Sequence, residues 1–159
     1  GKVWASALTQ KLQKLTGGSE RAAALDVGAN VNVAGFGLTG YYYDGRAIGT
    51  TLQFLGALDA SGNKRDSKGG YVQGTYTVPG VGTKLGLSWG KSILEANSAA
   101  DEGVLGLTKD VENTMWTVGA YHPLKKHLNL VAEYSDVKSE VQNLSGKSKT
   151  VSLGAILFF

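Results

Sequence analysis

The chain has 159 residues with a formal net charge of +3, and it contains 23 glycines, 2 prolines and no cysteine. The absence of cysteine excludes a disulfide framework and thiolate metal sites, and so small a net charge gives no electrostatic footprint for nucleic acid. No run of 18 apolar residues is present, which excludes a membrane-spanning helix. The length and the glycine content favour one strand-rich domain over residues 1–159.

Polar and apolar residues alternate along most of the chain, and this period predicts β-strands. In residues 2–15, Trp4, Leu8 and Leu12 also fall at helical spacing, so a helix remains an alternative there. We favour a strand. If the predicted strands cross a membrane, both chain ends lie on the same side of it only when this segment crosses as well. The predicted strands, in chain order, are residues 2–15, 22–33, 36–43, 70–78, 83–93, 113–122, 127–141 and 147–159.

Short and long connections alternate between these predicted strands. Short turns are expected at residues 34–35, 79–82 and 123–126, where glycine or proline punctuates the chain. Longer polar segments are expected at residues 16–21, 44–69, 94–112 and 142–146. Within the second of these, residues 51–58 are compatible with a short helix or a strand extension. Such alternation is typical of outer-membrane barrels, which have short periplasmic turns and longer extracellular loops.

One face of most predicted strands is apolar and carries aromatic residues near its ends, as the interfacial girdles of a membrane barrel do. The periplasmic girdle would contain Phe36, Tyr76 and Phe159. The outer girdle would contain Tyr42, Trp89, Trp116 and Tyr134. In a soluble sandwich these aromatics would more often lie mid-strand over a core. We therefore predict an all-β, transmembrane antiparallel up-and-down β-barrel with about eight strands in this chain.

The opposite face is polar or small, whereas an eight-stranded barrel usually fills its interior with bulky interlocking groups. An inner face made of such small or polar residues is typical of the wall of a wide, water-filled pore. The residues expected to line it are Asp26, Asn30, Gln73, Thr75, Lys84, Ser88, Thr117, Tyr121, Asn129, Glu133 and Ser135. Lys84, Asp26 and Glu133 are the inward charges expected nearest mid-membrane. They are candidates for ion selectivity, and the alternative for each is a solvated or locally paired wall charge.

The end of the chain is typical of the closing strand of an outer-membrane barrel. Leu157 and Phe159 fall on the lipid face, while Ser152 and Gly154 fall on the inner face. We expect these four residues to act as the signal that the barrel-assembly machinery reads. A soluble edge strand is the alternative.

Several segments together resemble a known family, the Gram-negative general-diffusion porins, and the chain looks like their C-terminal half. The resemblance lies in residues 1–7, 70–73, 83–88, 118–122, 128–134 and 152–159. It implies half of a sixteen-stranded barrel, usually a homotrimer, in the outer membrane of a Gram-negative bacterium. It leaves the first eight strands and the inward-folded constriction loop unaccounted for. The chain is then expected to be a truncated porin or a complete small barrel. Since strand-like sequence follows Gly1 directly, we also expect it to be a mature form or a piece of a longer chain.

The function that this resemblance implies is passive diffusion of small hydrophilic solutes and ions, with no cofactor and no metal. The partners expected are outer-membrane lipid, lipopolysaccharide and further copies of the chain. The alternative is a small eight-stranded structural or adhesion barrel with a plugged interior. A hydrolase is disfavoured because His122 and His127 flank a turn and are more typical of interface residues than of a catalytic base.

Overall fold

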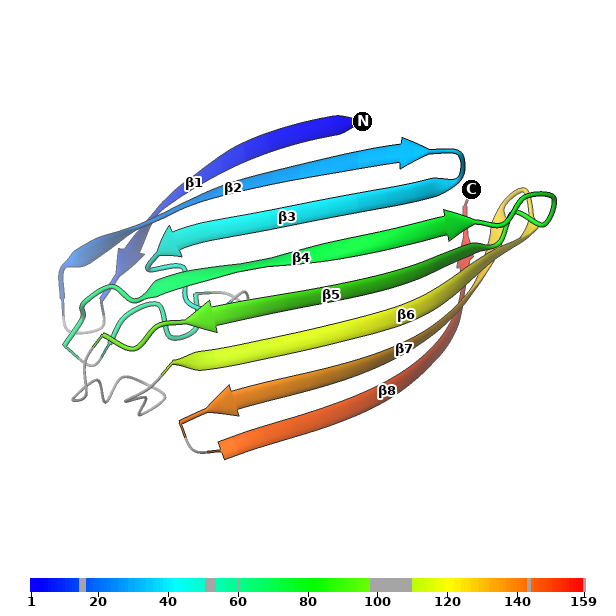
Figure 1. The fold of residues 1–159 in the computed structure, drawn as a ribbon. Coiled ribbons are helices and arrows are strands. Elements are labelled where there is room, and N and C mark those ends of the chain that lie inside the picture. Colours follow the sequence, from blue (N-terminus) through cyan, green and yellow to red (C-terminus); the bar gives the residue numbers. More distant parts are fainter. Residues whose placement is uncertain (15–16, 51–53, 60, 98–109, 143, 159) are drawn as a thin grey trace.

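The computed structural model describes the chain except for residues 15–16, 51–53, 60, 98–109, 143 and 159. Its strands form one antiparallel eight-stranded sheet in which neighbours in the chain are neighbours in space (Figure 1). They are β1 (Lys2–Gln13), β2 (Ser19–Val33), β3 (Phe36–Arg46), β4 (Asp66–Thr77), β5 (Lys84–Leu94), β6 (Val111–Lys125), β7 (Leu128–Val141) and β8 (Leu144–Leu157). The predicted all-β, up-and-down architecture is confirmed, and the first segment is a strand. No helix in the described part of the chain is long and apolar enough to cross a membrane.

Two of the predicted short turns contain residues with positive φ, a conformation that glycine adopts readily and alanine does not. Ala34 and Gly35 join β2 to β3 with φ values of 49° and 85°, the positive values that the twist of a hairpin requires. Between β4 and β5, Gly80 and Gly82 also have positive φ, at 77° and 73°. This second turn is closed by a backbone hydrogen bond of 2.8 Å from the amide of Val78 to the carbonyl of Thr83.

The third predicted turn, at residues 123–126, is shifted along the chain. Strand β6 continues to Lys125, and its pairing with β7 slips between Pro123 and Lys125. Proline has no amide hydrogen for the ladder, and such a register irregularity is a place where a strand accepts it. The turn itself comprises only residues 126–127.

The strict alternation of short and long connections is wrong for two of the four predicted loops. The connections at residues 14–18 and 142–143 are short, because β2 begins at Ser19 and β8 begins at Leu144. The connections at residues 47–65 and 95–110 are long, as expected, but shorter than predicted. Of the ambiguous segment 51–58, the described part forms a turn and an isolated bridge from Leu58 to Lys64, neither a helix nor an extension of a strand. Residues 51–53 lie outside the described part.

The sheet is a single curved layer without a central core. Figure 1 shows the strands bending together so that the end of β8 curls behind the sheet. The buried residues other than glycine gather where the long connections meet the sheet, namely at Ala22, Ala47, Ala57, Arg65, Ser67, Leu94 and Val111. The large apolar side chains on the strands are instead exposed, as for Val3 at 86% and Leu153 at 81%. A soluble sandwich would cover this apolar area with a second layer, so the packing favours a sheet that faces lipid.

Candidate functional site

The strand register separates two faces of the sheet, and one of them is polar. A row of polar residues crosses it from β2 to β7, each directly opposite the next: Asn30, Thr39, Gln73, Ser88, Thr117 and Ser135. Every residue predicted to line a pore lies on this polar face. The face is hollow, because a cavity of about 600 Å³ is lined by residues from β2 to β7, among them Asn30, Gln73, Lys84, Tyr121 and Asn129.

Hydrogen bonds link neighbouring side chains along the polar face. Asn30 Nδ2 donates to Thr39 Oγ1 at 2.8 Å, and the hydroxyls of Thr117 and Ser135 are 2.8 Å apart. Both predicted acidic selectivity residues are held in this way, since Ser6 donates to Asp26 and Tyr121 donates to Glu133. Because both donors are neutral hydroxyls, these contacts hold the two carboxylates in place without pairing their charges.

Lys84 lies elsewhere than expected. It is the first residue of β5, beside the turn that joins β4 to β5, and not near the middle of the strand. Its side chain borders the 600 Å³ cavity together with Thr75 and Asn129.

Besides the predicted Tyr121, the polar face carries Trp4, Tyr41 and Tyr43, which the sequence pattern was not used to place there. Tyr41 and Tyr43 flank the outward Tyr42 in the chain, so strand alternation already places them on the inner face, and Trp4 lies directly opposite Gly28 there. A Cβ on Gly28 would overlap the indole ring of Trp4. Such glycines on the polar face therefore make room for rings from neighbouring strands. The side chains on this face are larger than its composition indicates.

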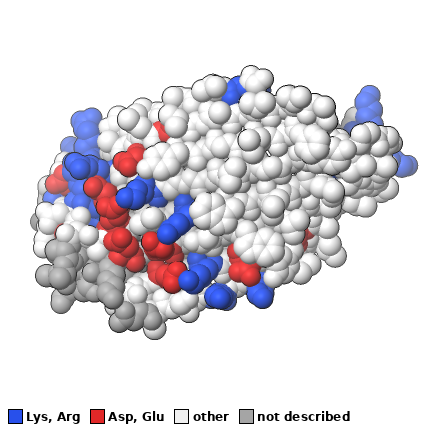
Figure 2. All heavy atoms as spheres, viewed as in Figure 1, with Lys and Arg blue, Asp and Glu red and all other residues white. Residues whose placement is uncertain are grey.

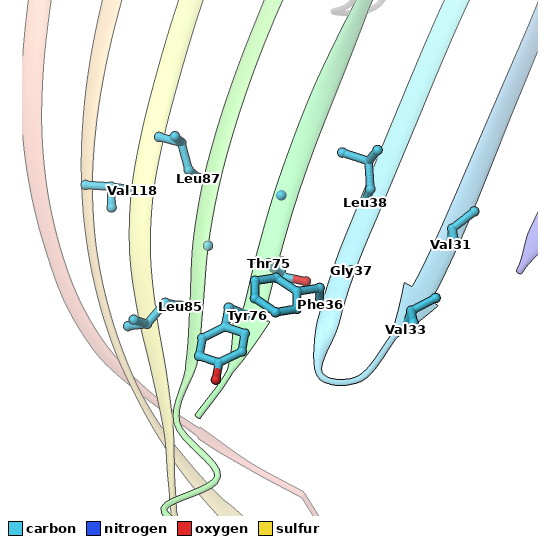
Figure 3. A pocket seen from close by; sticks show the side chains of 12 residues that line it. Val31, Val33, Phe36, Gly37, Leu38, Thr75, Tyr76, Leu85, Leu87 and Val118 are labelled. Carbon is cyan, nitrogen blue, oxygen red and sulfur yellow. The ribbon is translucent and has the colours of Figure 1, made fainter. Parts of the chain in front are cut away.

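The opposite face is apolar and presents outward the predicted aromatic residues that lie in the described part of the chain. The rings of Phe36 and Tyr76 lie 4.4 Å apart between centroids, and those of Trp116 and Tyr134 lie 5.2 Å apart. Trp89 is directly opposite Trp116, and Tyr42 is on the same face. An open groove of about 600 Å³ runs beside the first pair of rings, between Leu38 on one side and Leu85, Leu87 and Val118 on the other (Figure 3).

A belt of charged residues borders the apolar face toward the end of the sheet that carries the long connections. Figure 2 shows acidic and basic side chains gathered there, next to a broad uncharged surface. The belt residues on the apolar face of β3 to β8 are Asp44, Arg46, Asp66, Lys68, Lys91, Glu112, Asp136, Lys138, Glu140, Lys147 and Lys149. Cross-strand ion pairs join Arg46 to Asp66 at 3.1 Å and Lys91 to Glu112 at 2.7 Å.

The residues predicted as an assembly signal lie at the free edge of the sheet. Ser152 is opposite Glu133 and Gly154 is opposite Val131, both on the polar face of β8, while Leu157 faces outward. Phe159 lies outside the described residues, so its predicted place in the girdle and in the signal stays a prediction.

The histidines and carboxylates give no separate reactive cluster in the part of the chain that the structure describes. The Nδ1 atom of His122 is 2.9 Å from the hydroxyl of Thr83, next to the turns. Among these residues no group of three or more His, Cys, Asp or Glu side chains could hold a metal ion.

Comparison with known proteins was made at the levels of family, sequence and structure. A family model described as Gram-negative porin matches residues 2–142, which include β1 to β7. No curated protein and no solved structure matches the chain.

Proposed function

The chain belongs to the Gram-negative porin family, which places the protein in the outer membrane, and we propose that its polar face lines a water-filled pore for passive diffusion of small hydrophilic solutes and ions. The residues that we propose as the pore wall are those predicted from the sequence, extended by Ser6, Thr39, Tyr41 and Tyr43. The protein would act by bore and wall charge, without covalent chemistry.

The observation that carries this proposal is the separation of the two faces over the whole sheet. Polar side chains, hydrogen-bonded to one another, cover the hollow face, while large apolar side chains cover the other. In a transmembrane barrel the lipid face must be apolar, and a conducting lumen must hold water and polar groups. A plugged structural barrel would need interlocking bulky charges inside a closed sheet. In the described sheet, the edge strands β1 and β8 pair only with β2 and β7 and not with each other. The described sheet is therefore open, which does not favour the plugged barrel.

Single-channel recording in planar bilayers tests the proposal on the intact purified protein. We expect stepwise conductance that scales with salt concentration, as for a water-filled pore. The variant Ser88→Arg places a cation on the proposed wall and should shift ion selectivity toward anions, whereas Lys149→Gln on the outer belt should not. A folded protein that inserts but gives no conductance would contradict the pore function.

We also propose that lipid covers the apolar face and that lipopolysaccharide contacts the charged belt. The groove beside Phe36 and Tyr76 has apolar walls suited to acyl chains, and the belt carries Lys147 and Lys149 on its edge strand. Lysine side chains can bind lipid phosphates as point charges. The double variant Lys147→Gln and Lys149→Gln should retain less lipopolysaccharide during purification, and equal retention would argue against this contact.

For assembly we propose a homotrimer inserted by the barrel-assembly machinery through the C-terminal strand. The support is the family resemblance, together with the place of Ser152, Gly154 and Leu157 at the free edge of the sheet. Native mass spectrometry of the purified protein should give three copies, and any other number would overturn the trimer. Deleting Phe159 should slow insertion into vesicles that contain the machinery, and unchanged insertion would argue against the signal.

A further inference from the structure

A second cavity of about 320 Å³ lies between the polar face of β1 to β3 and the long connection at residues 47–65. Its lining includes Leu8, Asp26, Tyr41 and Tyr43 from the sheet and Ile48 and Phe54 from the connection. This volume is at the lower end of the range for small-molecule pockets, so the cavity suits a small solute.

The connection that forms the cover of this cavity is held in place by backbone hydrogen bonds. The amide of Ala47 donates to the carbonyl of Arg65 at 2.9 Å, and the amide of Arg65 donates to Ala57 at 3.0 Å. The Arg65 side chain is fully buried. Because these bonds fix the base of the connection, Ile48 beside Ala47 has a set place at the cavity, which reduces the ordering cost of binding.

The polar groups in the cavity favour a cation. Asp26 supplies a carboxylate that receives a hydrogen bond from the neutral hydroxyl of Ser6, and thus its negative charge is not neutralised by that contact. Tyr43 lies directly opposite Asp26, and its hydroxyl is buried without a hydrogen-bond partner among the described residues. Since that hydroxyl has almost no accessible surface, Asp26, which is only partly buried, is the polar group of this pair that a ligand in the cavity can reach.

The aromatic groups favour an apolar body attached to that cation. The ring of Tyr41 lies 6.4 Å from that of Tyr43 and 5.5 Å from that of Tyr71, between centroids. Electron-rich ring faces attract organic cations, and Leu8, Ile48 and Phe54 supply apolar contact on the other sides. A fully hydrated inorganic ion would gain nothing from these side chains.

We infer that this cavity binds a small organic ammonium ion with an aromatic or branched apolar body, its nitrogen at Asp26 and its body against Tyr41, Ile48 and Phe54. The inference rests on the proposed function in one respect, since the solute reaches the cavity from the lumen. It would make Asp26 a binding residue for permeating cations.

Isothermal titration calorimetry on the intact detergent-solubilised protein tests this site without relying on conductance. We expect phenethylammonium to bind, and phenylacetate and 2-phenylethanol to bind at least about tenfold more weakly, because a charge-assisted hydrogen bond is lost. Asp26→Asn should weaken phenethylammonium binding about tenfold.

The matched control is Asp136→Asn, which makes the same change on the apolar face of the sheet and outside the cavity. It should leave the affinity for phenethylammonium within about twofold, as expected for a distant independent site. Equal binding of the three probes, or wild-type affinity in Asp26→Asn, would overturn the site. Binding in a protein that does not conduct would refute the pore function alone, whereas conductance without binding would refute this site alone.

Discussion

At the scale of single residues, glycine on the inner wall serves packing between strands. Gly28 is buried and lies directly opposite Trp4, whose indole ring occupies the space that a Cβ would need. We expect Gly28→Ala to lower the free energy of unfolding by about 1–3 kcal/mol, the usual cost of overpacking. Urea unfolding of the protein in lipid vesicles would measure the change.

Gly40 provides the comparison for this substitution. It lies on the apolar face of β3 with no atom near the position of a Cβ, so Gly40→Ala should leave stability unchanged or raise it slightly. In a Trp4→Ala background, the cost of Gly28→Ala should largely disappear. An equal cost in both backgrounds would show that the indole ring is not the cause.

The side of the sheet on which a residue lies could be predicted from the sequence, but its contacts could not. Alternation alone puts Asp26, Gln73 and Glu133 on the same face, and the register agrees. The contact of Trp4 with Gly28 depends on which residues stand opposite each other in two strands, and no single-strand pattern contains that information. The cavity at Tyr43 depends further on the path of the connection at residues 47–65.

At the scale of the strands, existence and order could be predicted, while several ends could not. Beyond the apolar band, residues on both faces are polar, so the alternation that marks a strand is lost although pairing continues. Strand β4 shows this, because it begins with Asp66, Ser67 and Lys68, whereas the alternation favours a start at residue 70. The extra pairs at these ends carry the charged belt and its ion pairs.

The assignment of the two faces predicts opposite effects for adjacent residues of β5. Leu87 is 59% exposed on the apolar face, and Ser88 lies on the polar face. Leu87→Arg should destabilise the protein by about 2–4 kcal/mol, because arginine is costly on a lipid-facing strand near the midplane. Ser88→Arg should cost far less, since its guanidinium meets water. The temperature at which each folded variant unfolds in detergent electrophoresis would rank them.

Both variants introduce the same side chain at neighbouring positions, so intrinsic strand propensity is matched between them. The difference in stability therefore reports which face meets lipid. If Ser88→Arg proved as damaging as Leu87→Arg, or the order were reversed, the polar face could not line an aqueous lumen.

At the scale of the whole molecule, the described sheet has two edges with unpaired backbone groups. Strand β1 pairs on one side with β2, and β8 pairs on one side with β7. Unpaired amide and carbonyl groups are not tolerated in the hydrocarbon region of a membrane, which is why membrane sheets close into barrels. We propose that both edges pair with further strands in the membrane-embedded protein and that the described sheet is one segment of a larger barrel wall.

Hydrogen exchange on the intact protein in lipid measures this pairing directly. Amides of β1 and β8 should exchange as slowly as those of the central strand β4, because every strand then has two neighbours. Without partners, the outward-pointing amides of both edge strands would exchange fast wherever water reaches them. Since β3 and β4 are paired on both sides in the described sheet, their slow exchange is the internal reference. Fast exchange confined to β1 and β8 would mean that the barrel is not closed through these edges.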